Sequence, residues 1–117
     1  MRHFKHHEFD SPDAPGSGAK MDPEFLELLD DARQLAGVPF KINSGYRTPK
    51  RNKTVGGTEN SSHLRGYAAD ISCTNSTQRF RIIAALIAAG FTRIGIGRSF
   101  IHVDNDPLKT PGVSWLY

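Results

Sequence analysis

Apolar residues recur at helical spacing in two stretches, and residues that start and stop helices bound each stretch. The first predicted helix has Asp22 as its N-cap, Pro23 at its first position and Gly37 as its stop. Its apolar positions predict one buried face, made of Phe25, Leu28, Leu29, Ala32 and Leu35. This spacing is typical of an amphipathic helix that packs on a core.

The second predicted helix runs from about Thr77 to Ala89, with Asn75-Ser76 as its cap and Gly90 as its stop. Its predicted buried stripe consists of Phe80, Ile83, Ala84 and Ile87. This helix separates the predicted strands of the chain into an earlier pair and a later hairpin.

Four short segments have the apolar pattern of β-strands: Phe40–Ser44, Ala68–Cys73, Phe91–Gly97 and Ser99–Asp104. The last two are predicted to form a hairpin around Gly97-Arg98. Residues 10–20 and 45–60 are polar and contain Gly and Pro, which predicts loops. The tail from Asn105 is expected to be held to the core by Trp115 and Tyr117. The pattern predicts one α+β domain, residues 1–117, with a small, mostly antiparallel sheet.

Composition narrows the classes of partner. The 15 basic and 12 acidic side chains give a net charge of +3, which favours an anionic polymer but lacks the dense basic runs of a nucleic-acid arm. We therefore expect no nucleic-acid partner. The longest apolar run, residues 82–89, is too short to cross a bilayer, so no membrane insertion is expected. The single Cys73 excludes an internal disulfide, and no signal peptide is evident at the N-terminus, which predicts synthesis in the cytoplasm.

Two histidines and one carboxylate are candidates for a metal site. His63 and Asp70 stand in one short polar run, and His102 lies within an apolar run at residues 100–103. Two histidines with a carboxylate are a common ligand set for catalytic zinc, with the fourth position left for water. On a strand, His102 and Asp104 point to the same face, so Asp104 is a candidate either to orient His102 or to transfer protons.

Three segments carry a family resemblance: Ser44-Gly45-Tyr46-Arg47-Thr48-Pro49, Ser61-x-His63-x-x-Gly66-x-Ala68-x-Asp70 and Phe100-Ile101-His102-Val103-Asp104. Together they resemble the M15 family of zinc D-Ala-D-Ala carboxypeptidases and related peptidoglycan peptidases. The resemblance covers roughly residues 40–104. It implies a sheet flanked by helices, on a zinc scaffold that hedgehog signalling domains also resemble.

Carried over by position, the resemblance implies zinc bound by His63, Asp70 and His102. It also implies that Arg47 contacts a substrate carboxylate or polarised carbonyl, and that Ser61 hydrogen-bonds substrate near the ion. From the residues alone, a structural salt bridge for Arg47 and a turn-forming role for Ser61 stay open.

The chain departs from the family at one position. Many relatives have an acidic general base three residues before the last histidine ligand, where this chain has Ser99. We take Asp104 as the replacement catalytic carboxylate, ahead of Glu59 in the preceding loop.

The predicted function is therefore that of a zinc-dependent peptidoglycan peptidase. It would hydrolyse a D-alanyl bond of the stem peptide as a DD-carboxypeptidase or DD-endopeptidase. The small size suggests a monomeric enzyme of the bacteriophage endolysin type that acts on the bacterial cell wall. Two alternatives stay open: a non-catalytic zinc-binding module, motivated by Ser99, and an L-alanyl-D-glutamyl endopeptidase.

Overall fold

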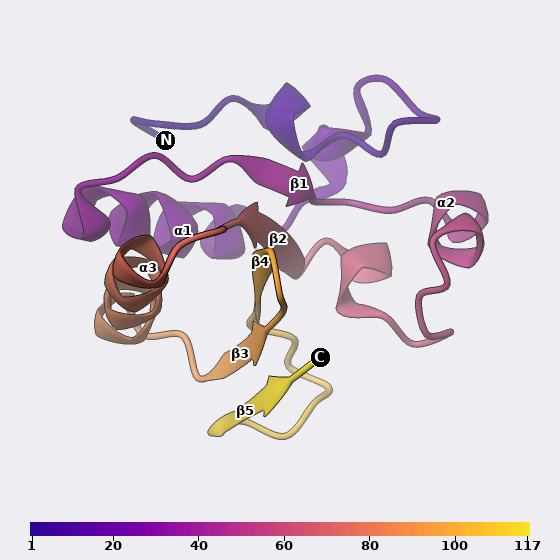
Figure 1. Ribbon diagram of the computed structural model, residues 1–117. Coiled ribbons are helices and arrows are strands. Elements are labelled where there is room, and N and C mark those ends of the chain that lie inside the picture. The colour runs from indigo at the N-terminus through magenta and orange to yellow at the C-terminus, as the bar shows by residue number, and fades with distance from the viewer.

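The computed structural model describes residues 1–117 and contains one five-stranded sheet, three α-helices and three short 3₁₀ turns (Figure 1). The helices are α1 (Pro23–Ala36), α2 (Pro49–Thr54) and α3 (Ser76–Ala89). The strands are β1 (Ile42–Ser44), β2 (Ala68–Ser72), β3 (Arg93–Ile96), β4 (Phe100–Asp104) and β5 (Val113–Leu116). The 3₁₀ turns are η1 (His6–Phe9), η2 (Ser17–Lys20) and η3 (Ser62–Arg65). The predicted α+β class is confirmed.

The sheet places β4 at its centre. Its strand order is β1-β2-β4-β3-β5, and every pair is antiparallel except β3 with β5. Across these pairs, Asp70 lies opposite His102 and Gly95 lies on the other side of His102. The sheet register alone therefore puts two of the predicted metal ligands side by side.

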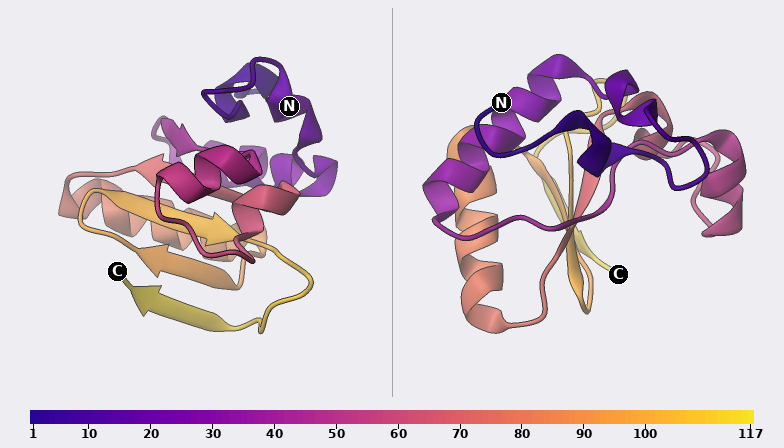
Figure 2. Two further views of the ribbon diagram at one scale, coloured as in Figure 1. Left: turned by 90° about the vertical axis from the view of Figure 1, so that its right-hand side faces the viewer. Right: turned by 90° about the horizontal axis from the view of Figure 1, so that it is seen from above.

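The two faces of the sheet have different coverings. Helices α1 and α3 lie on one side, whereas α2 and η3 lie on the other, as the view from above shows (Figure 2). On the helix side, Ile71, Ile101 and Val103 are fully buried in one hydrophobic cluster with residues of α1 and α3. Alternation along β4 then directs His102 and Asp104 to the opposite face.

The predicted helices form close to their expected bounds. The Asp22 side chain accepts a hydrogen bond from the Phe25 amide, and Gly37 ends α1 with φ of 67°. Leu35 is predicted to be buried but is 60% exposed. The helix buries Leu26 and Ala36 in its place, which shifts the buried face slightly around the axis.

The buried stripe predicted for α3 is wrong except at Ile83, which is partly buried against the core. Phe80 and Ile87 are 66% and 59% exposed, whereas the helix buries Ile82, Ala85 and Leu86. Residues 82–89 are apolar throughout, so spacing alone could not tell which side meets α1 and the sheet.

Two elements form where the sequence predicted none. Helix α2 lies within the predicted loop 45–60, with the Thr48 hydroxyl accepting from the Arg51 amide at its start. Strand β5 lies within the tail, where it pairs in parallel with β3. Trp115 and Tyr117 do not join the hydrophobic core as expected; they lie on the face of the sheet that carries His102. None of the helices has the length and apolarity that a bilayer crossing needs.

Candidate metal centre

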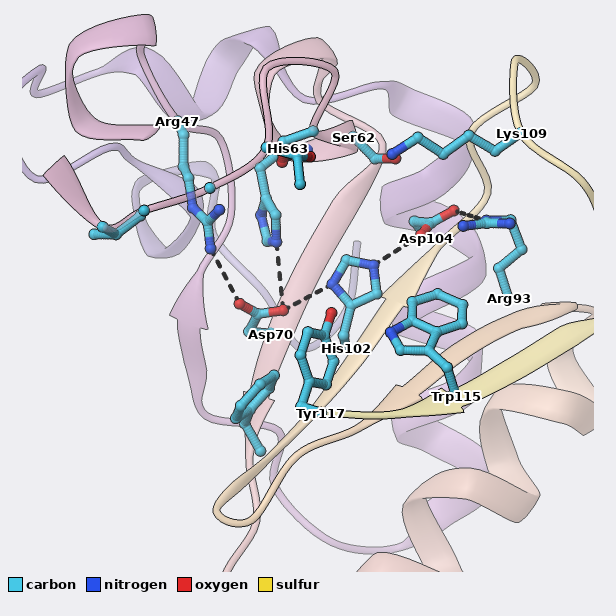
Figure 3. A pocket seen from close by; sticks show the side chains of 16 residues that line it. Arg47, Ser62, His63, Asp70, Arg93, His102, Asp104, Lys109, Trp115 and Tyr117 are labelled. Carbon is cyan, nitrogen blue, oxygen red and sulfur yellow. Dashed lines mark hydrogen bonds and ion pairs between the residues drawn. The ribbon is translucent and has the colours of Figure 1, made fainter. Parts of the chain in front are cut away.

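The three predicted metal ligands converge on one point. One ligating atom from each of His63, Asp70 and His102 lies within 4.8 Å of the others. Asp70 Oδ1 is 3.3 Å from His63 Nε2 and 2.9 Å from His102 Nδ1 (Figure 3). Tetrahedral zinc with bonds of about 2.0–2.1 Å separates its ligand atoms by about 3.4 Å. The two distances from Asp70 Oδ1 lie close to this spacing, so the donor set fits a zinc ion.

His63 is held by a distant backbone carbonyl and by a neighbouring side-chain hydroxyl. Its Nδ1–H donates to the Gly45 carbonyl over 2.7 Å, and because a carbonyl only accepts, Nε2 keeps its lone pair free for a metal. The Ser61 hydroxyl accepts from the His63 amide over 3.2 Å and caps η3. Gly66 ends η3 with φ of 79°, where its Cα packs closely on residues 20–22.

His102 lies between two carboxylates. Its Nδ1 faces Asp70 Oδ1, and its Nε2 lies 2.7 Å from Asp104 Oδ2. Burial lowers the pKa of His102, but the hydrogen bonds that it donates to Asp104 and Asp70 outweigh burial and raise the pKa above its ordinary value. With a metal on Nδ1, the Nε2–H would keep its bond to Asp104, as in the carboxylate–histidine–zinc arrangement.

Asp70 is the shared centre of the cluster. Burial raises its pKa, but hydrogen bonds from His102 and His63 outweigh this and hold the pKa well below its ordinary value. Its second oxygen, Oδ2, accepts from Arg47 over 3.3 Å. The carboxylate is therefore ionised near neutral pH, as a zinc ligand must be.

Asp104 is 1% exposed, and both of its oxygens have partners. Oδ2 accepts from His102, while Oδ1 accepts from Arg93 Nε over 2.7 Å and from the Asp106 amide over 3.3 Å. Arg93 also donates to the Thr110 carbonyl. The arrangement orients His102, and it leaves neither oxygen of Asp104 without a protein partner.

Arg47 stands beside the cluster and is fixed from three sides. It donates to the Ser44 hydroxyl over 3.0 Å, to Asn52 Oδ1 over 3.3 Å and to Asp70. Asn52 lies on α2 and also donates to the Thr58 carbonyl over 2.8 Å. The unpredicted helix thus fixes both the arginine and the neighbouring loop.

One cleft of about 290 Å³ is lined by the three predicted ligands together with Arg47 and Asp104. Its lining includes Ser61 and the loop 55–58, and across the cluster from Arg47 it also includes Arg93, Trp115 and Tyr117 (Figure 3). The last three residues were not predicted from the sequence as part of the site. The two-residue spacing of Trp115 and Tyr117 indicated that they share a face if the tail is a strand, but little else marked the tail as one. Neither Glu59 nor Ser99 lines this cleft.

Comparisons with known proteins agree with this geometry. The sequence model of the family described as Peptidase M15 matches residues 3–104. The chain is also similar to a zinc D-Ala-D-Ala carboxypeptidase of Streptomyces albus G, with 38% identity over 61 residues. That alignment covers 51% of this chain and 23% of the relative. The chain therefore spans about a quarter of that relative's length.

Proposed function

The chain belongs to the Peptidase M15 family, and on this premise we propose that it hydrolyses a D-alanyl bond in the stem peptide of bacterial peptidoglycan. It is a metallopeptidase whose cofactor is zinc. The observation that carries the proposal is the convergence of His63 Nε2, Asp70 Oδ1 and His102 Nδ1 in one cleft beside Arg47.

We assign the three ligands His63, Asp70 and His102 to the zinc ion. Bound zinc supplies a Lewis acid that polarises the scissile carbonyl and activates water near neutral pH. The chain's own residues hold that centre: the Gly45 carbonyl fixes the tautomer of His63, and Asp104 fixes the orientation of His102.

Arg47 is the proposed substrate-binding cation. Its guanidinium lines the cleft and is fixed by Ser44, Asn52 and Asp70, so it presents a defined edge to a carboxylate or to the developing oxyanion. Ser61 also lines the cleft, and its hydroxyl hydrogen remains free to donate to substrate, because its oxygen accepts from the His63 amide.

For Asp104 we propose that it orients His102 and does not transfer protons. Both oxygens are already engaged, and the side chain is fully buried. These contacts favour a positioning role for Asp104, in which it keeps the His102 Nε2 proton in place. They do not favour a role in which Asp104 carries a proton to the leaving amine.

The wider setting is part of the same proposal. We propose a monomer of one domain, residues 1–117, made in the cytoplasm and acting on the bacterial cell wall in the manner of a phage endolysin. The net charge of +3 supports an anionic polymer as substrate.

Mass spectrometry of defined muropeptides tests the proposal. Zinc-loaded protein should release D-alanine or split a D-Ala cross-link, and chelator should abolish the product. An Asp70→Ala variant is the matched control. Products cut between L-Ala and D-Glu would move the assignment to an L-alanyl-D-glutamyl endopeptidase.

One observation favours a second candidate, a non-catalytic zinc-binding module. The only acidic residues that line the cleft are Asp70 and Asp104, and both are fully paired. No unpaired carboxylate is then available as a general base. If zinc raises the melting temperature but no muropeptide is cut under any condition, the module is the better assignment.

A further inference from the structure

We propose that the C-terminal strand forms a specificity wall, defined as the side chains of Trp115 and Tyr117. The wall packs against the small apolar side chain of the substrate residue that carries the scissile carbonyl. The inference rests on the proposed function, because it assumes that the cleft binds a peptide. It concerns β5, which lies beyond residue 104 and thus outside the family match.

Alternation along β5 directs both aromatic rings to the metal centre. The ring centroids of Trp115 and Tyr117 lie 5.5 Å and 6.3 Å from that of His102 (Figure 3). Leu116, between them, is 79% exposed and does not line the cleft. The Tyr117 amide donates to the Ile96 carbonyl over 3.0 Å, which extends the pairing with β3 to the end of the wall.

Glycine on the neighbouring strand makes room for the wall. A Cβ on Gly95 would lie 2.6 Å from both Trp115 Nε1 and Tyr117 Cε2. Gly95 is also the cross-strand partner of His102, so the rings lie over bare backbone immediately beside a metal ligand. Any side chain at this position would push the aromatic rings away from the metal centre.

The two rings differ in how they are held. Trp115 is fixed by the Arg93 guanidinium, which lies 5.1 Å from its ring centroid. Tyr117 packs on Phe100 at 4.9 Å but is 66% exposed, so much of its ring is free to meet a ligand. A free aromatic surface at the edge of a metal cleft is suited to cover an apolar group of the substrate.

The position of the wall suggests which substrate residue it meets. Arg47 and the wall both line the cleft, and the ligand cluster lies between them (Figure 3). Because the Tyr117 ring centroid lies 6.3 Å from that of His102, we place the substrate side chain next to the scissile carbonyl, on the residue that carries it, against Tyr117. The rings of Trp115 and Tyr117 both line the cleft, and their apolar faces suit a small apolar group such as the methyl of alanine.

Paired peptide substrates test the wall. Two peptides differ only in D-Ala or Gly at the residue that carries the scissile carbonyl. We expect the unaltered protein to prefer D-Ala by about tenfold in kcat/KM, the usual effect of one methyl group in an apolar subsite. Tyr117→Ala should reduce this preference to about twofold or less, whereas Tyr117→Phe should keep it, because the ring and not the hydroxyl makes the contact.

Leu116→Ala is the matched control, since it shortens the same strand's side chain on the face away from the cleft. It should keep the preference. Zinc affinity, measured by competition with a chromophoric chelator, should be the same in all variants. If Tyr117→Ala weakens zinc binding but keeps the preference for D-Ala, the wall only supports His102 and the proposal is overturned.

A binding measurement separates this test from the proposed function. Trp115 is the only tryptophan of the chain, so its fluorescence reports directly on the wall. When zinc-free protein, prepared with a chelator, is titrated with the D-Ala peptide, the tryptophan emission should change. Tyr117→Ala should weaken the apparent affinity for the peptide several-fold relative to Leu116→Ala. If the peptide binds equally to both variants, the wall is wrong, even where cleavage is seen. If it binds but is never cut with zinc, the wall stands and the peptidase assignment fails.

Discussion

The two faces of the sheet meet along β4 and are stabilised in opposite ways. Ile101 and Val103 have no exposed surface and pack among the apolar side chains of the helix-covered face. Phe100, His102 and Asp104 alternate with them and face the cleft, where contacts run through charged hydrogen bonds. Neighbouring residues thus carry separate tasks: one set stabilises the fold, and the other holds the metal centre.

The comparison teaches that the charged side chains around His102 on the cleft face are paired with one another. Asp70 and Asp104 each accept from His102, and an arginine neutralises each of them from the other side. Breaking one partner leaves a buried charge uncompensated, which costs more than the intact pair contributes. Substitutions on the cleft face should therefore lower zinc binding and activity, whereas substitutions on the helix-covered face should lower the free energy of unfolding.

The largest effect is expected from Asp70→Ala. The variant loses the ligand that faces both histidines, so zinc binding should be lost and activity should fall by ~1000-fold or more. Activity on muropeptides and zinc content after dialysis are the measurements. Ser72→Ala, two residues along β2, is the control and should keep both. Full zinc content in Asp70→Ala would remove Asp70 from the ligand set.

On the other face, Ile101→Ala should act on stability instead. Ile101 is fully buried, so truncation should lower the free energy of unfolding by about 2–5 kcal/mol. Urea unfolding of the zinc-free protein measures this. Activity per folded molecule should stay within about twofold. A large loss of activity in the folded fraction would show that the two faces are not separable.

Asp104→Asn should weaken zinc binding by about 10–100-fold, because His102 loses the carboxylate that orients it. Competition with a chromophoric chelator measures the affinity, and circular dichroism checks the fold. A proton-shuttling Asp104 would instead show unchanged zinc affinity with a lowered kcat.

Zinc affinity should also fall as the pH is lowered. The paired carboxylates raise the pKa of His102 despite its burial, so the metal must displace a proton from this ring. Below the raised pKa, the apparent affinity should drop by up to about tenfold per pH unit. Chelator competition between about pH 6 and 8 tests the sign; affinity that rises on acidification would contradict the protonation state assigned to His102.

The smallest effect is expected from Glu59→Gln. Glu59 is exposed and lies outside the metal cleft, so kcat/KM should change by about twofold at most. Steady-state kinetics on one muropeptide decides this. A strong loss would restore Glu59 as the general base that its position before the motif suggested.

The sequence predicted the parts of the fold that local signals control. Caps and stops placed α1 and α3, and alternation placed β2 and β4, so Asp70 and His102 were both expected on strands of one small sheet. The face of α3 could not be predicted, because apolar residues surround its second half and only contact with α1 decides which side is buried.

The rest of the site depends on contacts between distant segments. The Gly45 carbonyl that fixes His63 is 18 residues away, and no residue type marks a backbone acceptor. Strand β5 forms because it pairs with β3, so its four residues carry little signal of their own. The metal ligands were therefore easier to predict than the residues that surround them.

The direct pairing of Asp70 with His102 across β2 and β4 ties the metal site to the register of these two strands. In the native register, Ile71 lies opposite Ile101, one step along from the two ligands. A slip of one residue would turn an isoleucine into the cleft and an imidazole into the apolar cluster. The misaligned chain would therefore lose its buried apolar face and its ligand set together. The buried apolar residues thus select the strand register that aligns the metal ligands, although none of them belongs to the ligand set.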